Sequence, residues 1–332
     1  MKKFVTLTLL AASVAAAADM KITSRIHIGA EGSWDYLYVD SAARRLYVSH
    51  ATRIVVVDVD TEKVVGEIPD TQGVHGIALA PKINRGFTSN GRANNVTIVD
   101  LKTLKTVGQV KTGQNPDAIA YDEKTNRVIT FNGRSKDGTV FEAETGKVIA
   151  TIPFGGKPEF SAGDNKGKMW VNIEDTHEVA EVDLVNAKVT KRYTLAGCEE
   201  PSGLAMDFQR NHIFSVCGNG VMIVSDPAAG KVVAKLPIGD GADGVAFDPG
   251  TGMAYSSNGE GSVTAVQFKD GKYVVAATIP TQRGARTIAI DPKTHKLYLP
   301  TAKYAPAPPA AEGKKAARPT ALPDSFMVLV IQ

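Results

Sequence analysis

One pattern recurs along nearly the whole chain, with a period close to 42 residues. Each repeat holds an apolar run, a polar turn, a second apolar run and two further strand-like runs. The residue just before each first apolar run, here called the anchor residue, marks the repeat: Asp35, His75, Asp117, Glu159, Ser202, Asp243 and Arg286. Successive anchors are 40, 42, 42, 43, 41 and 43 residues apart. Such regularity, with no linker between repeats, indicates that each repeat is one small structural unit that packs on the next.

The composition of the runs predicts strands. Val, Ile, Thr and Tyr dominate runs such as "IVVVDV" (54–59) and "KVIATI" (147–152), and Gly, Asp and Asn fill the turns between them. No segment after the first 18 residues keeps a 3.6-residue apolar period long enough for a sizeable helix. Four short strands in about 42 residues are typical of a β-propeller blade, and the unbroken period disfavours two or three separate β-sandwich domains. We therefore predict an all-β, seven-bladed β-propeller with four-stranded antiparallel blades.

The two ends of the chain are expected to share a blade. The seventh repeat lacks a fourth run, because the chain ends at "SFMVLVIQ". The missing run stands at the other end, where "KITSRIHIG" (21–29) precedes the first anchor as "KVIATIPFG" (147–155) precedes Glu159. Pairing of 21–29 with 326–332 would close the ring and leave no free sheet edge between the ends.

The first 18 residues, "MKKFVTLTLLAASVAAAA", have the features of a secretory signal peptide: two lysines, a short apolar core and small residues before Asp19. This predicts a periplasmic or secreted protein in which 19–332 form a single propeller domain. Without the two lysines, the chain holds 36 basic and 35 acidic residues. A net charge near +1 disfavours nucleic-acid binding, since phosphate binding depends on clustered Lys and Arg.

Export also bears on the two cysteines, Cys198 and Cys217. An even count in an exported chain favours a disulfide between them, with two buried free thiols as the alternative.

The second runs carry a family resemblance. Their endings resemble the YVTN repeat: "YVSH" (47–50), "FTSN" (87–90), "ITFN" (129–132), "MWVN" (169–172) and "YSSN" (255–258). Over about residues 20–332 the chain is similar to the YVTN-repeat β-propellers, specifically the periplasmic YncE-like proteins. The resemblance implies a seven-bladed propeller but not a function, because propellers host many activities. Some members are described as DNA-binding or cell-surface proteins, and the near-neutral charge gives DNA binding no support.

The anchor residues are the candidate site. In a propeller the first strand of each blade starts at one mouth of the central channel, where packing does not dictate the residue type. We expect a ligand to contact this predicted set: Trp34, Asp35, His75, Asp117, Glu159, Asp243, Arg286 and Tyr304. Trp34 could instead pack between blades. Arg286 is the expected anion contact, and Glu159 and Asp243 would balance its charge or carry protons.

A second set of residues closes the second runs, and these strand-end residues are His50, Asn90, Asn132, Asn172, Cys217, Asn258 and Thr301. Asn90, Asn132 and Asn258 each precede Gly, so we interpret them as turn caps. His50 and His75 are expected to face the same mouth beside Asp35 and Asp117. Two imidazoles with carboxylates suit zinc or copper, whereas the alternative is a hydrogen-bonded ring without metal.

The segment 301–325 is a long Pro/Ala-rich insertion between the second and third strands of the last blade. Its composition is typical of a linker, whereas its place at the mouth suggests a lid, with Lys303 and Tyr304 reaching the channel.

Three functions remain open. Motifs for nucleotide hydrolysis, nucleophile-elbow serine chemistry and Cys-rich zinc sites are absent. The leading hypothesis is a monomeric binding or scaffold protein that takes a small polar ligand, or a loop of a periplasmic partner, at the mouth. A metal-dependent, lactonase-like hydrolase at the same mouth is the alternative, and single-stranded nucleic-acid binding is the third.

Overall fold

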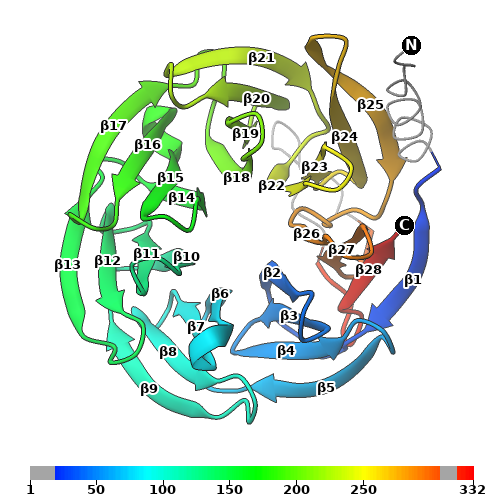
Figure 1. Cartoon of the computed structure of the whole chain (residues 1–332). Helices are drawn as coiled ribbons and strands as arrows, with labels where there is room; N and C mark the ends of the chain where they lie inside the picture. The colour runs from blue at the N-terminus through cyan, green and yellow to red at the C-terminus, as the bar shows by residue number, and fades with distance from the viewer. Residues whose placement is uncertain (1–18, 307–319) are drawn as a thin grey trace, which may run out of the picture.

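The computed structural model describes residues 19–306 and 320–332. They form seven four-stranded antiparallel sheets arranged as blades around a central channel (Figure 1). In blades one to six the strands follow one another in sequence order from the channel outward. The predicted fold class is confirmed. The proposed signal peptide (1–18) lies outside the described residues, and no helix within the described ranges is long and apolar enough to cross a membrane.

The first strand of each blade lines the channel. These strands are β2 (Trp34–Asp40), β6 (Val74–Ala80), β10 (Pro116–Asp122), β14 (Pro158–Gly163), β18 (Pro201–Asp207), β22 (Ala242–Asp248) and β26 (Ala289–Asp291). Several end in Asp, whose carboxylate accepts hydrogen bonds from the next turn, as Asp40 does from the N–H groups of Ala42 and Ala43. The Asp therefore ends the strand by satisfying the turn.

The middle strands are the most buried, because a blade packs against a neighbour on each face. The second strands are β3 (Arg45–His50), β7 (Arg85–Asn90), β11 (Arg127–Asn132), β15 (Lys168–Ile173), β19 (His212–Cys217), β23 (Met253–Asn258) and β27 (Lys296–Thr301). The third are β4 (Arg53–Asp58), β8 (Asn95–Asp100), β12 (Asp137–Glu142), β16 (Glu178–Asp183), β20 (Val221–Asp226), β24 (Ser262–Lys269) and β28 (Met327–Ile331). Two 3₁₀ turns, η1 (Pro81–Ile83) and η2 (Glu174–Thr176), lie in connections.

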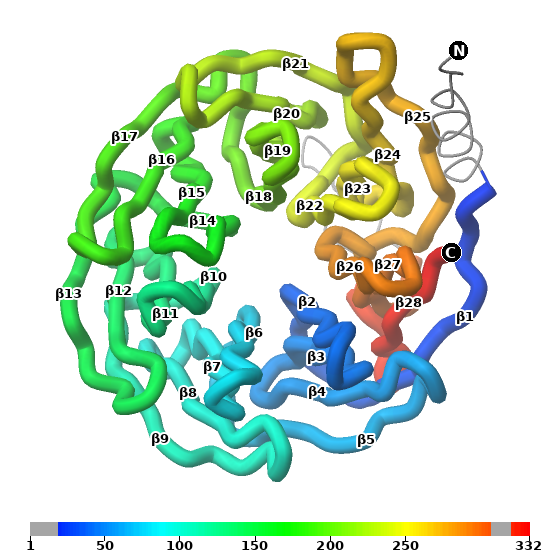
Figure 2. The backbone as a smooth tube through the Cα atoms, viewed as in Figure 1, coloured from blue at the N-terminus to red at the C-terminus, as the bar shows by residue number. Residues whose placement is uncertain are grey.

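The outer strands are partly exposed. They are β5 (Lys63–Ile68), β9 (Thr106–Lys111), β13 (Val148–Pro153), β17 (Lys188–Thr194), β21 (Lys231–Pro237), β25 (Lys272–Pro280) and β1 (Ile22–His27). The last blade takes its outer strand from the N-terminus: β1 pairs antiparallel with β28, in the order β1-β28-β27-β26. Figure 2 shows β1 running beside β28. The predicted closure is thus confirmed.

The core is divided among the gaps between blades. The described residues form seven buried apolar clusters, one in each gap. In the gap between blades three and four, for example, Ile129 and Phe131 pack with Met169 and Val171. Burial of these side chains, about 1.5–3 kcal/mol each, stabilises the ring only when every blade has both neighbours.

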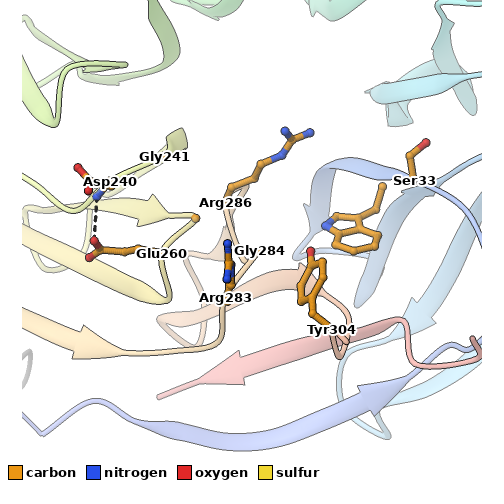
Figure 3. A pocket seen from close by; sticks show the side chains of 10 residues that line it. Ser33, Asp240, Gly241, Glu260, Arg283, Gly284, Arg286 and Tyr304 are labelled. Carbon is orange, nitrogen blue, oxygen red and sulfur yellow. Dashed lines mark hydrogen bonds between the residues drawn. The ribbon is translucent and has the colours of Figure 1, made fainter. Parts of the chain in front are cut away.

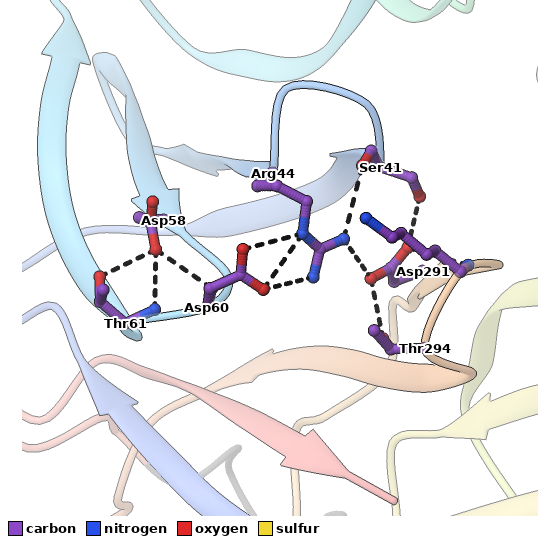
Figure 4. Close-up of polar contacts among 8 residues, drawn as sticks. Ser41, Arg44, Asp58, Asp60, Thr61, Asp291 and Thr294 are labelled. Atoms are coloured by element: carbon purple, nitrogen blue, oxygen red, sulfur yellow. Dashed lines mark hydrogen bonds and ion pairs between the residues drawn. The ribbon is translucent and has the colours of Figure 1, made fainter.

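A charged group ties the first blade to the last on the face opposite the mouth (Figure 4). Arg44 of the β2–β3 turn lies 2.7 Å from a carboxylate oxygen of Asp291 and 2.7 Å from one of Asp60. Asp291 is fully buried and also accepts a hydrogen bond from Ser41. Burial raises the pKa of Asp291, but the hydrogen bonds from Ser41 and Arg44 outweigh it and lower the pKa to about 2. The carboxylate therefore stays charged and holds Arg44 across the junction.

Candidate functional site

A β-bulge positions the anchor residue in six blades. In β2, β6, β10, β14, β18 and β22 the pairing with the second strand shifts after the first residue, and the anchor is the second residue. Thus Trp34 pairs with His50, and regular pairing begins again at Leu37, which leaves Asp35 within the bulge. A bulge bends the strand and changes the direction of its side chains. The anchor side chain therefore does not have to follow the regular alternation between the two faces of the sheet. The anchors of several blades can therefore meet at the mouth.

Three of these anchors form one compact group. His75 Nδ1 lies 2.6 Å from a carboxylate oxygen of Asp35 and 3.5 Å from one of Asp117. One donor atom from each residue lies within 4.8 Å of the others. The side chains come from blades one, two and three, and that of His75 is 26% exposed. The structure thus brings together three residues that the sequence analysis placed at the mouth.

Electrostatics make this group unusual. Burial lowers the pKa of His75, but the hydrogen bond to Asp35 and the charge of Asp117 outweigh it, and the pKa rises to about 9. Burial, with the charges of Asp35 and Asp243, raises the pKa of Asp117 to about 6 against the opposing charge of His75. At neutral pH the group holds an imidazolium between carboxylates. Perturbed pKa values of this kind cluster at functional sites.

The remaining charged anchors form pairs around the rest of the mouth. Arg286 Nε lies 3.3 Å from Asp243, and 43% of the Arg286 side chain is exposed. Glu159 lies 2.6 Å from Nζ of Lys157, which also contacts Glu174. Burial and the charge of Asp117 raise the pKa of Glu159. The sequence analysis missed Lys157, which lies immediately before β14; its position two residues from the anchor was the one usable signal.

The channel narrows beneath these groups. The rings of Tyr36 and Phe160, from blades one and four, have centroids 4.7 Å apart. Tyr36 is 9% exposed, and burial and the charges of Asp117 and Asp35 raise the pKa of its hydroxyl well above its usual value. These aromatic rings floor the mouth. In both strands the aromatic residue directly follows the anchor within the bulge, and it closes the channel below the charged side chains.

A pocket of about 700 Å³ opens beside the group, between blades six, seven and one. Its walls differ in chemistry, as Figure 3 shows: Asp240 and Glu260 lie on one side, Arg283 and Arg286 in the middle, and Tyr304 on the other side. Trp34 lies beside Tyr304, with ring centroids 6.4 Å apart, and stacks on Phe326 at 5.1 Å. Trp34 therefore both packs between blades and walls the pocket, so the two sequence alternatives hold together. The lining residues are Ser33, Trp34, Asp240, Gly241, Gly259, Glu260, Arg283, Gly284, Arg286 and Tyr304.

One end of the insertion 301–325 reaches this pocket through Tyr304, and the other end pairs with it. Tyr304 and Ala321 form a β-bridge, Ala305 N–H donates to Thr320 O, and Leu322 N–H donates to Lys303 O. The ends therefore form a short paired ribbon that holds Tyr304 in the pocket wall. The middle of the predicted lid, 307–319, lies outside the described residues.

His50 lies apart from the carboxylates. It is fully buried, and its ring stacks on Phe326 with centroids 4.3 Å apart. Burial and the charge of Arg53 lower the pKa of His50 to about 4, so the imidazole is neutral at physiological pH. The group within 4.8 Å consists of Asp35, His75 and Asp117, and the structure does not bring His50 into it.

Three strand-end asparagines have a structural role, as expected, but with other partners. Asn132 is fully buried, accepts a hydrogen bond from Thr130, and donates to Asp137 and Thr139 of the next strand. Asn90 and Asn258 repeat this arrangement. They bridge two strands of a blade rather than capping turn N–H groups, because the side chains point into the sheet.

Two other strand-end residues need comment. In blade four the residue paired with the first strand is Ile173, so the alignment of Asn172 with Asn132 is wrong by one position. Asn172 instead donates to the carbonyls of Ser202 and Gly203 in blade five. Cys217 forms a disulfide with Cys198, as predicted.

Comparison with known proteins supports the fold alone. No protein-family model and no curated protein matches the sequence. Among solved structures, a chain of hydrazine synthase from Kuenenia stuttgartiensis is similar, with a TM-score of 0.71 and 17% identity, covering 83% of this chain and 94% of that chain. This likeness supports the seven-bladed propeller. The YVTN resemblance stays a prediction.

Proposed function

We propose that this protein is an exported binding propeller, periplasmic or secreted, that takes a small organic anion with a planar part at the channel mouth. The observation that carries the proposal is the pocket of about 700 Å³ in which two arginines lie beside an aromatic wall. Ligand sites typically combine such apolar walls with a few placed polar groups.

The arginines are suited to an anion because their charge is only partly used. Arg286 pairs with Asp243 through Nε, and Arg283 forms no ion pair within the described part of the chain. A guanidinium binds a carboxylate or phosphate with two parallel hydrogen bonds. Trp34 and Tyr304 offer ring faces to a planar group. The glycines at 241, 259 and 284 leave the pocket wall without side chains, which admits a ligand close to the backbone.

Fluorescence of Trp34 can test this proposal. The chain has two tryptophans, so the variant Trp170→Phe leaves Trp34 as the sole reporter. Titration with phenyl phosphate and benzoate should change its emission in a saturable way, whereas benzylamine should not. Adding Arg286→Ala should weaken anion binding about tenfold or more, since hydrogen bonds to charged groups contribute about 1.5–3 kcal/mol.

A matched control is Arg134→Ala, which removes an exposed arginine from the β11–β12 connection of blade three. It should leave anion binding unchanged. The proposal is wrong if neither anion gives a saturable change, or if both arginine variants bind like the parent.

A metal-dependent, lactonase-like hydrolase is the second candidate, and the observation that favours it is the group of Asp35, His75 and Asp117 beside the pocket. A metal there could polarise a carbonyl, with Glu159 or Asp243 as proton carrier. Hydrolysis of simple lactones by metal-loaded protein, lost in Asp117→Asn, would support it.

A further inference from the structure

We propose that Asp35, His75 and Asp117 bind one divalent cation of the zinc class, with one ligand from each of three consecutive blades. This site is independent of the proposed organic anion, because its donor atoms lie in the channel and outside the set that lines the pocket.

The donor atoms are already close to a metal-binding arrangement. Atoms that share a zinc ion at about 2.0–2.2 Å lie roughly 3–3.5 Å from one another. His75 Nδ1 lies 2.6 Å from Asp35 and 3.5 Å from Asp117, which brackets that spacing. Small side-chain rotations would admit an ion. One imidazole with two carboxylates suits borderline first-row ions better than calcium or magnesium, which prefer oxygen alone.

The imidazole is oriented for this role. The side chain of Asn115 lies beside the imidazole, whose Nδ1 contacts Asp35. A Cβ at Gly91 would lie 2.5 Å from His75 Nε2 and 2.8 Å from Asn115 Oδ1, so both atoms lie against this glycine. Metal-binding histidines usually donate the other ring N–H to an oxygen, which fixes the tautomer. Asn115 is placed to accept from Nε2 and leave Nδ1 for the ion.

The backbones of both carboxylates are held by neighbouring blades. Ser89 Oγ donates to the carbonyl of Asp117 at 2.5 Å, and Thr287 Oγ1 donates to the carbonyl of Asp35 at 2.7 Å. The bulged strands are therefore fixed where they present their side chains. Such support decides whether ligands keep their geometry when the ion leaves.

A polar group also lies next to the three ligands. The Tyr36 hydroxyl, on a side chain more than nine-tenths buried, lies amid the charges of Asp117, Asp35, Glu159 and Asp243. Among the described residues no hydrogen bond to this hydroxyl is found. The hydroxyl is not among the fully buried unpartnered atoms, so it opens onto the channel, where a water bound to the ion could reach it.

Zinc binding to chelator-treated, full-length mature protein tests the proposal. Competition with a chromogenic chelator should show one equivalent of tightly bound Zn²⁺. Asp117→Asn and His75→Asn should each weaken binding at least about a hundredfold, as loss of a ligand does. His27→Asn is the matched control, because it removes a histidine from an exposed pair with Asp324, and it should bind like the parent.

X-ray absorption of the zinc-loaded parent gives a readout that needs no variant to fold. One imidazole with oxygen ligands is expected. Two imidazoles would overturn this ligand set in favour of a site that includes His50, and His50→Phe would then lose the ion. Absence of bound zinc in the parent, or equal affinity in His75→Asn, would overturn the site altogether.

Discussion

At the scale of single residues, variation among the anchors has a physical cause. The framework of each blade demands apolar residues at the same places, whereas in six blades the anchor lies in a bulge at the mouth, where it can contact residues of neighbouring blades. Ser202, for example, donates to the carbonyl of Ala242 in the next blade, whereas Asp35 and Asp117 hold His75 between them. The residue type at each anchor therefore depends on its contacts with neighbouring blades.

The charge on His75 should make stability depend on pH in metal-free protein. Its pKa is about 9 in the folded protein against an ordinary value of 6.5, so its contribution is complete below pH 6.5 and is lost as pH rises to 9. The stability difference between the parent and His75→Asn should shrink over this range, by about 3 kcal/mol at most.

Urea unfolding in the presence of a chelator, at steps from pH 6.5 to 9.5, measures this difference. The range starts at 6.5 because Asp117, whose pKa is about 6, gains a proton below it. A constant difference across the range would show that His75 is not charged in the folded protein.

At the scale of strands and turns, the mouth is built by bulges, buried amides and one disulfide. Six first strands shift register at the anchor, and three buried asparagines tie the second strand to the third below it. The bulge lets the anchor side chain leave the regular direction of the strand, while the asparagine holds the ends of the two strands together. The residue type at the anchor can therefore vary while the backbone stays fixed.

In blade five, which lacks a strand-end asparagine, the disulfide holds the end of the second strand at the mouth. Cys198 and Cys217 are 19 residues apart in sequence and nearly fully buried. Replacing both by Ala should lower the free energy of unfolding by about 3 kcal/mol, because the closed loop restricts the unfolded chain.

Denaturant unfolding of parent and double variant, both without reductant, gives the value. The reduced parent should match the variant closely, since small buried side chains occupy the site in either case. Equal stability of oxidised parent and variant would contradict a stabilising disulfide.

At the scale of the whole molecule, closure of the ring supports every blade. The last blade depends on β1, whose Ile26 is buried in the cluster shared by blades seven and one. On the opposite face Arg44 joins the same two blades through Asp291. The junction that could open most easily is thus held by strand pairing, apolar packing and a buried ion pair.

Deleting residues 19–29 should destabilise the protein by on the order of 5 kcal/mol, because it exposes the edge of β28 and removes a buried side chain. Calorimetry gives the melting temperature. Deletion of residues 19 and 20 alone keeps β1 and should have a much smaller effect. If both deletions melt like the parent, closure contributes nothing to stability.

The sequence by itself determined the architecture of this protein. A 42-residue period with four strand-like runs allows few folds, and the unpaired run at each end implies the shared blade. The same period located the anchors, because equivalent positions in a ring reach the same mouth. Two cysteines, together with the predicted export signal, were enough to predict the disulfide. These conclusions need only local pattern and symmetry.

Only the tertiary structure decided which of these side chains meet. Alternation along a strand predicts the face of the sheet on which a residue lies. The bulges and the narrowing of the channel decide where its side chain points. His50 therefore stacks on Phe326 although it belongs to the repeat, while Tyr36 meets Phe160 from a distant blade. Contacts between residues about 40 or more positions apart depend on how blades pack, and packing is a property of the closed ring rather than of any one repeat.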